Sequence, residues 1–494
     1  MRVLFVISDL HFSEPLGAMI LSAVCKENGH ITRLAVLRRD NYSAVLDDFR
    51  PDVIAYSCMT SDESLFAIAI KEARSWSVKT GHVVKQIMGG PHPTFFPEVV
   101  RKLELDGICA GDGERAIIRM LDAFSRGESL RGIPNVSTMD YAYEEKEVVE
   151  DMNAVPFGDR DLIYDHSPEL LSQGIRSFLT QKGCPYKCTY CFNHAYNRLF
   201  KGDGRKILRR RSVDNVIQEI QQVVDKYPVV RFVRFADDVF VIQKDKWLEE
   251  FAERYPKEVG IPFYCLIRCN SLTEEVAQLL SKAGCRSISM SIEAGTAKIR
   301  NDIMKRNMPD EMLEQSFAIS RKYKLNAFAN TILAVPGTTY KDDYTSVMFA
   351  RKLRAACPTF TMFSPYPGTD LTNYAISIGV LDSEFDYNEV SSFDRSVLTN
   401  YTKEELMLQT NLVFLGTLIC KVPSFMLPTM DFLIKRTWTP IYRVVGTLFV
   451  TYMLATRLFP GAQPRSAKGI LKAVLRSLQY FAFFNKKNKS EGAE

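Results

Sequence analysis

Short apolar runs alternate with amphipathic stretches over the first 125 residues of the chain. The amphipathic stretches, such as Leu16–Lys26 and Ser64–Trp76, have helical spacing. The apolar runs predict strands at Val3–Ile7, Asp52–Ser57, Val83–Met88 and Asp106–Ala110. Strands that alternate with helices form a parallel sheet covered on both faces, and such a sheet binds ligands at the carboxyl ends of its strands. We therefore predict an α/β fold that begins with a doubly wound, Rossmann-like domain over residues 1–125.

A second series of β/α units follows residues 126–170, which are rich in glycine, proline and charge and are predicted to be a connector. Six further strands are predicted at Ile175–Thr180, Val230–Phe235, Phe263–Ile267, Ser287–Ile292, Ala327–Leu333 and Thr359–Phe363. Six β/α units predict a partial, TIM-like barrel over residues 171–382, with its chemistry at the carboxyl ends of the strands. Residues 383–494 have a helical and aromatic pattern, and we expect a mainly helical C-terminal region there.

Composition narrows the class of protein further. Hydrophobic residues make up 46% of the chain and charged residues 24%, which excludes a wholly disordered or collagen-like protein. The net charge of +5 is too small for a chain of 494 residues to predict nucleic-acid binding. Eleven cysteines are too few for a disulfide scaffold, and no window of about 18 apolar residues predicts a membrane-spanning helix. We therefore expect a cytoplasmic protein with reduced thiols.

A cysteine-rich loop is the strongest chemical signal. Cys184, Cys188 and Cys191 lie within eight residues, directly after the first predicted barrel strand. Thiolates are soft ligands for iron–sulfur clusters, zinc or copper(I), and three of them on a [4Fe–4S] cluster leave one iron open. A zinc site with His194 as fourth ligand is the main alternative, and three unrelated buried thiols are another. The position of the loop, where catalytic loops of barrels lie, favours the cluster.

These cysteines resemble the CxxxCxxC signature of the radical S-adenosylmethionine (SAM) enzymes. Further segments resemble the same family at later strand ends: Phe235-Ala236-Asp237-Asp238, Ser291-Ile292-Glu293-Ala294-Gly295 and Val335-Pro336-Gly337-Thr338. The resemblance implies that Cys184, Cys188 and Cys191 bind a [4Fe–4S] cluster. It also implies that Tyr190, Asp237 and Glu293 contact SAM, with Asp237 near its amino group and Glu293 at its ribose. Arg268 is a candidate for the SAM carboxylate.

The N-terminal domain resembles the cobalamin-binding subfamily of these enzymes. The resemblance rests on two turns, Gly89-Gly90-Pro91-His92-Pro93 and Gly111-Asp112-Gly113-Glu114, and it implies cobalamin contacts by Ser57, Gly89, Gly90, His92 and Gly111. Asp112 departs from the glutamate more common in the subfamily. The first β/α turn lacks GxGxxG, which argues against a dinucleotide. His11 is expected to be a turn residue and not the lower cobalt ligand.

The resemblance implies a SAM-dependent radical reaction, most often the methylation of an unactivated carbon. In that reaction a 5′-deoxyadenosyl radical removes a substrate hydrogen, and methylcobalamin supplies the methyl group. Two alternatives remain: a non-methylating cyclisation or oxidation of a tetrapyrrole or lipid, and a non-catalytic cobalamin-binding protein with a zinc site. The expected partners are a small or lipid-like substrate and an electron donor such as flavodoxin or ferredoxin.

The C-terminal region raises the possibility of peripheral membrane contact. Leu412–Ile419 and Val444–Ala455 are apolar but too short to span a bilayer. Ala467–Phe484 places apolar and basic residues on different helical faces, which fits an interfacial helix on an anionic membrane. A helix packed on the barrel fits the same pattern. Contact with the inner face of a membrane would favour a lipid-like substrate.

Overall fold

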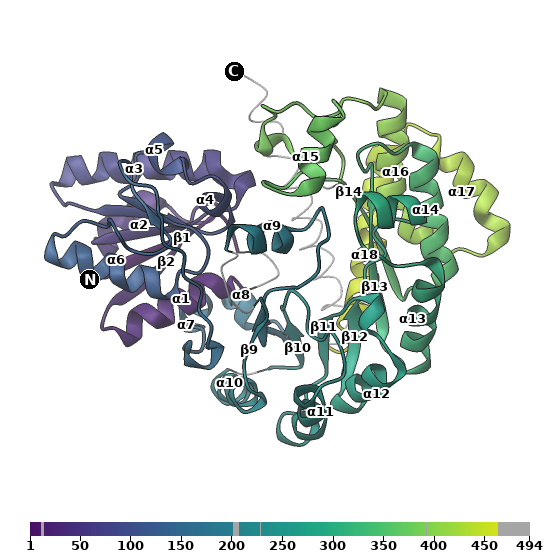
Figure 1. Ribbon diagram of the computed structural model, residues 1–494, viewed down its shortest axis with the longest axis horizontal. Coiled ribbons are helices and arrows are strands. Elements are labelled where there is room, and N and C mark those ends of the chain that lie inside the picture. The colour runs from purple at the N-terminus through teal and green to yellow at the C-terminus, as the bar shows by residue number, and fades with distance from the viewer. Residues whose placement is uncertain (11–13, 201–206, 228, 392, 463–494) are drawn as a thin grey trace. The chain divides into compact units, whose positions relative to one another are not determined.

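The computed structural model describes residues 1–10, 14–200, 207–227, 229–391 and 393–462. The chain forms two compact units (Figure 1). The first unit contains Met1–Ser172, Tyr196–Arg211 and Asp386–Glu389, and the second contains the remaining segments. The residues predicted to be a connector, 126–170, thus lie within the first unit.

The first unit is built on a six-stranded sheet with the order β2-β1-β3-β4-β5-β6. Its strands are β1 (Arg2–Ile7), β2 (Ile31–Val36), β3 (Val53–Ser57), β4 (Lys85–Gly89), β5 (Gly107–Cys109) and β6 (Val136–Ser137). The first five strands pair in parallel, and β6 pairs with β5 in antiparallel orientation. The larger helices are α1 (Leu16–Glu27), α2 (Tyr42–Phe49), α3 (Glu63–Thr80) and α6 (Glu114–Arg126), and the shorter ones are α4 (Pro91–Phe95), α5 (Val99–Lys102), α7 (Asp161–Tyr164) and α8 (Pro168–Leu171). This is the doubly wound α/β architecture that the sequence predicts.

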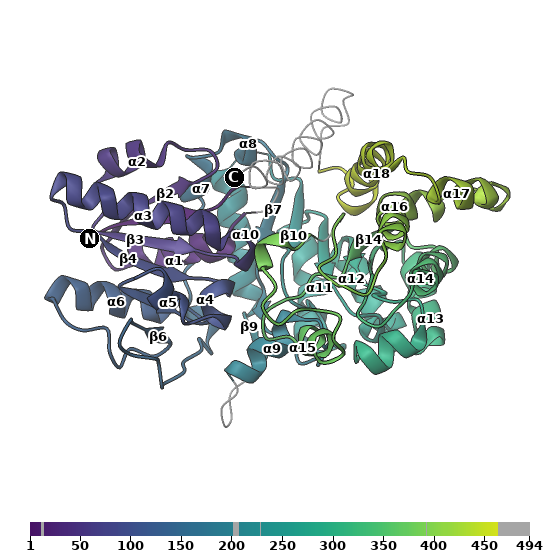
Figure 2. The same cartoon turned by 90° about the horizontal axis from the view of Figure 1, so that it is seen from above.

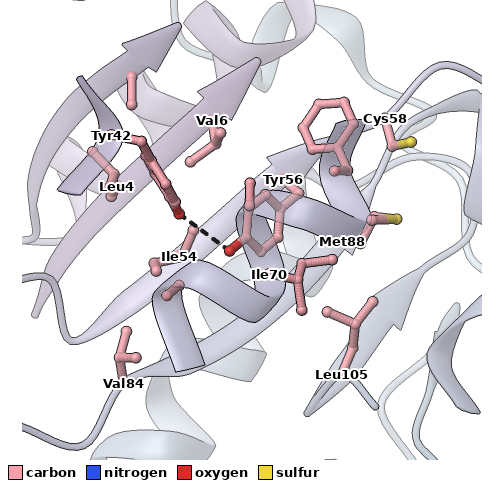
Figure 3. Packing of buried hydrophobic residues seen from close by; sticks show 14 of the residues in the cluster. Leu4, Val6, Tyr42, Ile54, Tyr56, Cys58, Ile70, Val84, Met88 and Leu105 are labelled. Atoms are coloured by element: carbon pink, nitrogen blue, oxygen red, sulfur yellow. Dashed lines mark hydrogen bonds between the residues drawn. The ribbon is translucent and has the colours of Figure 1, made fainter. Parts of the chain in front are cut away.

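Side chains from β1, β3 and β4 form one continuous apolar layer under α2 and α3 (Figure 3). The parallel register places Val6 beside Tyr56 and Tyr56 beside Met88. Tyr56 is buried, and its hydroxyl lies 3.2 Å from that of Tyr42 and donates to Gln86 Oε1 at 2.7 Å. The buried Tyr56 hydroxyl therefore has hydrogen-bond partners within the core. Because the strands are parallel and in register, their carboxyl ends lie at the same edge of the sheet.

The second unit contains a six-stranded parallel sheet with the order β14-β13-β12-β11-β10-β7. Its strands are β7 (Ile175–Phe178), β10 (Phe232–Phe235), β11 (Phe263–Leu266), β12 (Cys285–Ser289), β13 (Asn326–Leu333) and β14 (Cys357–Met362). The covering helices are α10 (Val213–Lys226), α11 (Lys246–Glu258), α12 (Glu274–Ala283), α13 (Asp310–Lys322) and α14 (Tyr340–Leu353). β7 and β14 are edge strands, so the sheet is the open, partial barrel that the sequence predicts.

Smaller elements complete the chain. The two short strands are β8 (Gln181–Lys182) and β9 (Arg209–Arg210), and α9 (Phe192–Leu199) and α15 (Asp370–Ser377) follow the cysteine loop and the last barrel strand. The short helical turns are η1 (Thr60–Asp62), η2 (Met152–Ala154), η3 (Cys269–Ser271), η4 (Ile299–Ile303), η5 (Tyr387–Glu389), η6 (Ser424–Met426) and η7 (Leu454–Leu458).

The C-terminal helices α16 (Lys403–Ile419), α17 (Leu427–Ile434) and α18 (Thr439–Met453) group at one end of the second unit (Figure 2). α16 begins with a capping box of Thr402 and Glu405. A Cβ at Gly416 would lie 2.5 Å from the Phe360 ring, so the glycine lets α16 approach β14 closely. Within the described ranges, no helix is long and apolar enough to cross a membrane.

Candidate cluster and cofactor sites

The cysteine loop begins where β7 ends. Asp237, at the end of β10, accepts hydrogen bonds from Thr180 N at 2.6 Å, Thr180 Oγ1 at 2.7 Å and Gln181 N at 3.0 Å. Asp238 accepts from Gly183 N at 2.8 Å, and Gly183 has a positive φ of 93°. Two consecutive carboxylates therefore fix the backbone that leads into the cysteines.

The family resemblance predicts that Asp237 contacts the SAM amino group. In the structure, however, the Asp237 carboxyl is buried. Asp237 is 1% exposed, both of its oxygens accept hydrogen bonds, and burial raises its pKa to about 7. Asp238 is the exposed carboxylate at the same strand end. The role of Asp237 toward SAM stays a prediction, and its observed role is to position the loop.

The three thiols lie close enough to affect one another electrostatically. Burial, with a smaller contribution from charge on Cys188 and Cys184, raises the pKa of Cys191 to about 12 against the lowering effect of the Asn193 N–H. Burial likewise raises the pKa of Cys184, while the Tyr186 N–H lowers it. Cys188 is buried, and its carbonyl accepts from Cys191 N at 3.1 Å. Three crowded, desolvated thiols are costly as free thiolates, and binding to a metal cluster removes that cost.

His194, the fourth ligand in the zinc alternative, has another partner. Its Nε2 lies 3.2 Å from Asp370 Oδ2. Among the described residues, no group of three or more His, Cys, Asp or Glu side chains is arranged around a single-ion position. The observed partner of His194 is thus Asp370, the first residue of α15.

Arg268, which follows the end of β11, contacts the cysteine loop. Its guanidinium lies over the Tyr186 ring at 3.7 Å, and its Nη1 donates to Cys188 Sγ at 3.4 Å. Its Nη2 donates to the Arg306 carbonyl at 2.7 Å. The side chain therefore places positive charge beside Cys188, one of the three predicted cluster ligands. Contact with a SAM carboxylate stays a prediction.

A buried polar network joins Tyr190 to the end of β12. The Tyr190 hydroxyl donates to Glu293 Oε1 at 2.9 Å and accepts from Arg306 Nη1 at 2.7 Å. Glu293 is 6% exposed, and its Oε2 makes no hydrogen bond. Burial raises the pKa of Glu293, and the nearby Arg306 opposes that shift. Glu293 therefore keeps one carboxylate oxygen available in a buried position, which suits a pair of ligand hydroxyls.

The backbone around this network is strained. Glu293 has φ 66°, in the left-handed region that residues with a Cβ rarely adopt. Lys305 and Asn307 both have φ 53°, so Arg306 lies between two left-handed residues. Such strain costs of order 1–3 kcal/mol per residue and concentrates at functional sites. Arg306 was not identified from the sequence because its loop carries no motif.

The carboxyl edge of the first sheet carries the residues predicted for cobalamin. Ser57 is exposed at the end of β3, and a Cβ at Gly89 would meet no atom within 4 Å, so the edge is open there. Gly90 has φ 99°, and a Cβ would lie 2.9 Å from the Cys58 carbonyl oxygen. Gly90 is thus required by the close approach of its own loop to Cys58.

His92 is buried on the short helix α4. It is 3% exposed, and neither ring nitrogen makes a hydrogen bond. Its Nε2 lies 3.6 Å from Glu63 Oε2, and burial lowers its pKa. A buried imidazole without hydrogen bonds is unusual, and it leaves a donor and an acceptor for a ligand at this edge.

Thr94 links the two glycine turns, although the sequence analysis did not identify it. Its hydroxyl donates to the Gly90 carbonyl at 2.8 Å and accepts from Gly111 N at 3.0 Å. Gly111 has φ 81°, and a Cβ there would lie 2.5 Å from the Phe200 ring. The contact of Gly111 with cobalamin stays a prediction, and its observed neighbour is Phe200.

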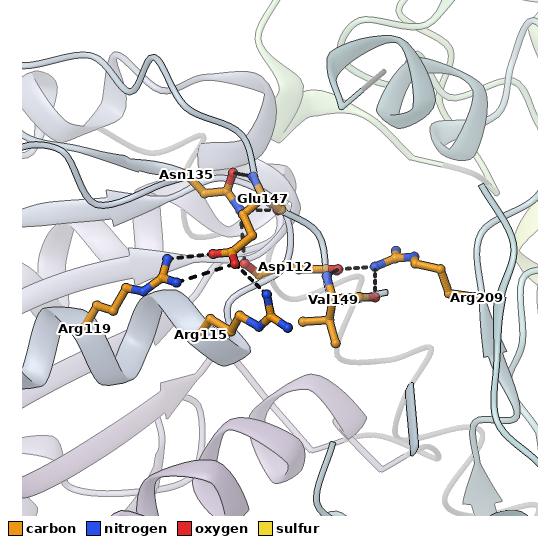
Figure 4. Close-up of polar contacts among 7 residues, drawn as sticks. All are labelled: Asp112, Arg115, Arg119, Asn135, Glu147, Val149 and Arg209. Atoms are coloured by element: carbon orange, nitrogen blue, oxygen red, sulfur yellow. Dashed lines mark hydrogen bonds and ion pairs between the residues drawn. The ribbon is translucent and has the colours of Figure 1, made fainter. Parts of the chain in front are cut away.

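Asp112, the departure from the subfamily pattern, forms a buried ion pair with Arg209 (Figure 4). Asp112 Oδ2 also accepts from Val149 N at 3.0 Å, and the Tyr196 hydroxyl donates to Oδ1 at 3.5 Å. Burial lowers the pKa of Arg209, but the Asp112 carboxylate outweighs it and raises the pKa overall. The glycine turn is thereby fixed to the 196–211 segment of the first unit.

His11 lies outside the described residues, and so does the helix predicted at Ala467–Phe484.

Comparison with known proteins identifies both domains. Residues 178–348 match the family model of the radical SAM superfamily, and residues 3–121 match that of the B12 binding domain. An uncharacterized methyltransferase of Pyrococcus horikoshii is 24% identical over 79% of this chain and 85% of its own length. The anaerobic magnesium-protoporphyrin IX monomethyl ester cyclase of Rubrivivax gelatinosus is 22% identical, over 75% of this chain and 69% of its own length.

Among solved structures, the chain is similar to the cobalamin-dependent S-adenosylmethionine radical enzyme OxsB with aqua-cobalamin bound. The TM-score is 0.68 at 12% identity, over 99% of this chain and 80% of that one, and this likeness concerns the fold. The chain belongs to the family of radical SAM proteins that carry a B12-binding domain.

The radical SAM domain implies SAM and a [4Fe–4S] cluster, and the B12-binding domain implies cobalamin. The residues present fit these groups. Three adjacent thiols match the ligand set of a cluster with one open iron, and the free Glu293 oxygen matches a ribose. The open edge at Gly89 and the unbonded His92 ring match a bulky cofactor at the first sheet.

Proposed function

We propose that this protein is a methyltransferase that transfers a methyl group to an unactivated carbon of a small or lipid-like substrate. The observation that carries the proposal is the buried Tyr190–Glu293–Arg306 network beside the cysteine loop, with one Glu293 oxygen left free. The B12-binding domain and the relative named as a methyltransferase support methylation as the outcome.

When bound, the cluster supplies the electron that cleaves SAM, and cobalamin supplies the methyl group. The protein's own residues bind and orient. Cys184, Cys188 and Cys191 hold the cluster, and Glu293 accepts hydrogen bonds from the SAM ribose. Arg306 pairs with Glu293 Oε1 and opposes the rise in the pKa of Glu293 that burial causes, because a buried carboxylate needs a paired cation.

A second candidate is a cyclase or oxidase of a tetrapyrrole. The observation that favours it is the likeness to the Rubrivivax gelatinosus cyclase, which covers 75% of this chain. Both candidates use the same cluster residues, so they differ only in the fate of the substrate.

Labelling with methyl-deuterated methionine distinguishes the two candidates. Cells with the wild-type gene, cells without it and cells with Cys184→Ala would be fed the label, and their metabolites would be compared by mass spectrometry. Methylation predicts a compound that carries the trideuterated methyl group only in wild-type cells. A product that depends on Cys184 but gains no label would favour the cyclase or oxidase.

A further inference from the structure

The outward face of α18 is apolar and exposed. Trp438, Ile441, Val445 and Tyr452 recur at helical spacing, and about half of each side chain is exposed, up to 58% for Ile441. The opposite face, which includes Gly446, packs on α16, since a Cβ at Gly446 would meet the backbone of Phe414. α18 is therefore held firmly by one face while it presents the other to its surroundings.

The segment that leads into α18 also exposes large apolar side chains. Phe425, before α17, is 81% exposed, and Phe432 near the end of α17 is 53% exposed. The guanidinium of Arg436 lies 3.9 Å from the centre of the Phe432 ring. We call the exposed side chains of residues 425–452 the α17–α18 surface; its large apolar members are Phe425, Phe432, Trp438, Ile441, Val444, Val445 and Tyr452.

The net charge of this region is positive. Residues 421–462 contain one acidic residue, Asp431, and five basic ones, namely Lys421, Lys435, Arg436, Arg443 and Arg457. Asp431 accepts a hydrogen bond from the Tyr344 hydroxyl at 2.6 Å, and Arg443 pairs with Asp394 at 2.6 Å. Lys435, Arg436 and Arg457 are exposed at the two ends of α18.

We propose that the α17–α18 surface docks the protein peripherally on an anionic lipid bilayer. Exposed aromatic and branched aliphatic side chains flanked by Lys and Arg match the boundary between acyl chains and anionic headgroups. The single acidic residue in the segment fits a negatively charged partner. The proposal uses only described residues and does not depend on the reaction that the protein catalyses.

Flotation of the full-length protein tests the proposal. Vesicles of phosphatidylglycerol and phosphatidylcholine would be compared with vesicles of phosphatidylcholine alone, at low and high salt. We expect flotation with the anionic vesicles only, and less of it at high salt because salt screens the basic residues. Ile441→Ser with Val445→Ser should lower the partition coefficient about tenfold, since two exposed apolar anchors are lost. Lys435→Glu with Arg436→Glu should abolish flotation.

The chain offers a control in Val78→Ser with Val83→Ser, which removes two still more exposed apolar side chains from the first unit. This variant should float like the wild type, and circular dichroism would show that each variant is folded. Absence of flotation at low salt overturns the proposal. So does flotation that the Ile441/Val445 variant leaves unchanged. A wild-type dimer that becomes monomeric in that variant without lipid would identify a second copy as the occupant instead.

Discussion

Arg268 is the residue that we expect to influence the reduction potential of the cluster, because it contacts Cys188 Sγ. With Cys188 as a cluster ligand, as predicted, donation from Arg268 would withdraw electron density from the ligand sulfur, and the charge of Arg268 would favour the reduced cluster. Arg268→Gln should therefore make the reduction potential of the [4Fe–4S] cluster more negative, with iron content unchanged. A redox titration followed by electron paramagnetic resonance measures this shift. Arg286→Gln, an exposed change on β12, should leave the potential unaltered; an equal shift in both variants would argue against the contact.

The three cysteines and His194 should respond differently to substitution. Alanine at Cys184, Cys188 or Cys191 should abolish the broad visible absorption of the reconstituted cluster and all SAM cleavage, because each removes a ligand. His194→Ala should retain the cluster, since its ring pairs with Asp370. Iron, sulfide and zinc analysis checks both results. Loss of metal only in His194→Ala would support the zinc site.

At the scale of elements, Asp343 in the first turn of α14 binds the backbone of the turn that follows β13. Its carboxyl is 2% exposed and accepts from Ala334 N at 2.9 Å and Gln409 Nε2 at 2.8 Å. Burial raises its pKa from 3.8 to about 7. Between these values the folded protein retains a proton that the unfolded chain releases, so the free energy of unfolding falls as pH rises through this window.

Asp343→Asn should remove this contribution to the pH dependence, because an amide does not titrate and still accepts from Ala334 N. Asp237 has a similarly raised pKa and contributes to the same pH window. Between pH 5 and pH 8, urea denaturation should therefore show a loss of unfolding free energy that is smaller in the variant than in the wild type by on the order of 2 kcal/mol. Glu253→Gln, at an exposed carboxyl of α11, should keep the wild-type behaviour. The same slope in wild type and Asp343→Asn would mean that Asp343 is ionised throughout.

The Asp112–Arg209 pair joins the glycine turn before α6 to β9. Arg209→Met should lower the free energy of unfolding by about 3 kcal/mol, because it leaves a buried carboxylate without its cation. Adding Asp112→Asn should recover part of that loss, and chemical denaturation of both variants measures it. Arg115→Met breaks an exposed pair with Glu147 and should cost less than about 1 kcal/mol. Equal losses in Arg209→Met and Arg115→Met would refute a buried role for Arg209.

The strands that could be predicted from the sequence are those in which nearly every residue is apolar and buried. The strands β1, β3 and β10 are buried almost throughout, and their apolar runs predict them. The strand β2 was not named because Thr32 and Arg33 interrupt its first half, which is partly exposed. The cysteines were found because their spacing is local. Arg306, Thr94 and Arg209 act through contacts between distant segments, which no local pattern records.

At the scale of the whole molecule, the first compact unit is built from segments that are not continuous in the sequence. The segment Tyr196–Arg211 follows the cysteine loop in the chain but belongs to the first unit, as does Asp386–Glu389. Phe200 packs on Gly111 and Tyr387 on Phe96, with ring centres 5.3 Å apart in the second case. Residues 1–125 alone would therefore lack side chains that cover the unit's glycine turns.

The most direct test of the proposed methylation is the pair of SAM products. The reconstituted protein would be incubated with SAM, a reductant, cobalamin and a metabolite extract from cells that lack the gene. The proposed methylation would consume two SAM molecules per turnover, one for the radical step and one as the source of the methyl group. We expect 5′-deoxyadenosine and S-adenosylhomocysteine in equal amounts, both dependent on Cys188 and on the extract. Extract-dependent 5′-deoxyadenosine without S-adenosylhomocysteine would contradict the proposed methylation.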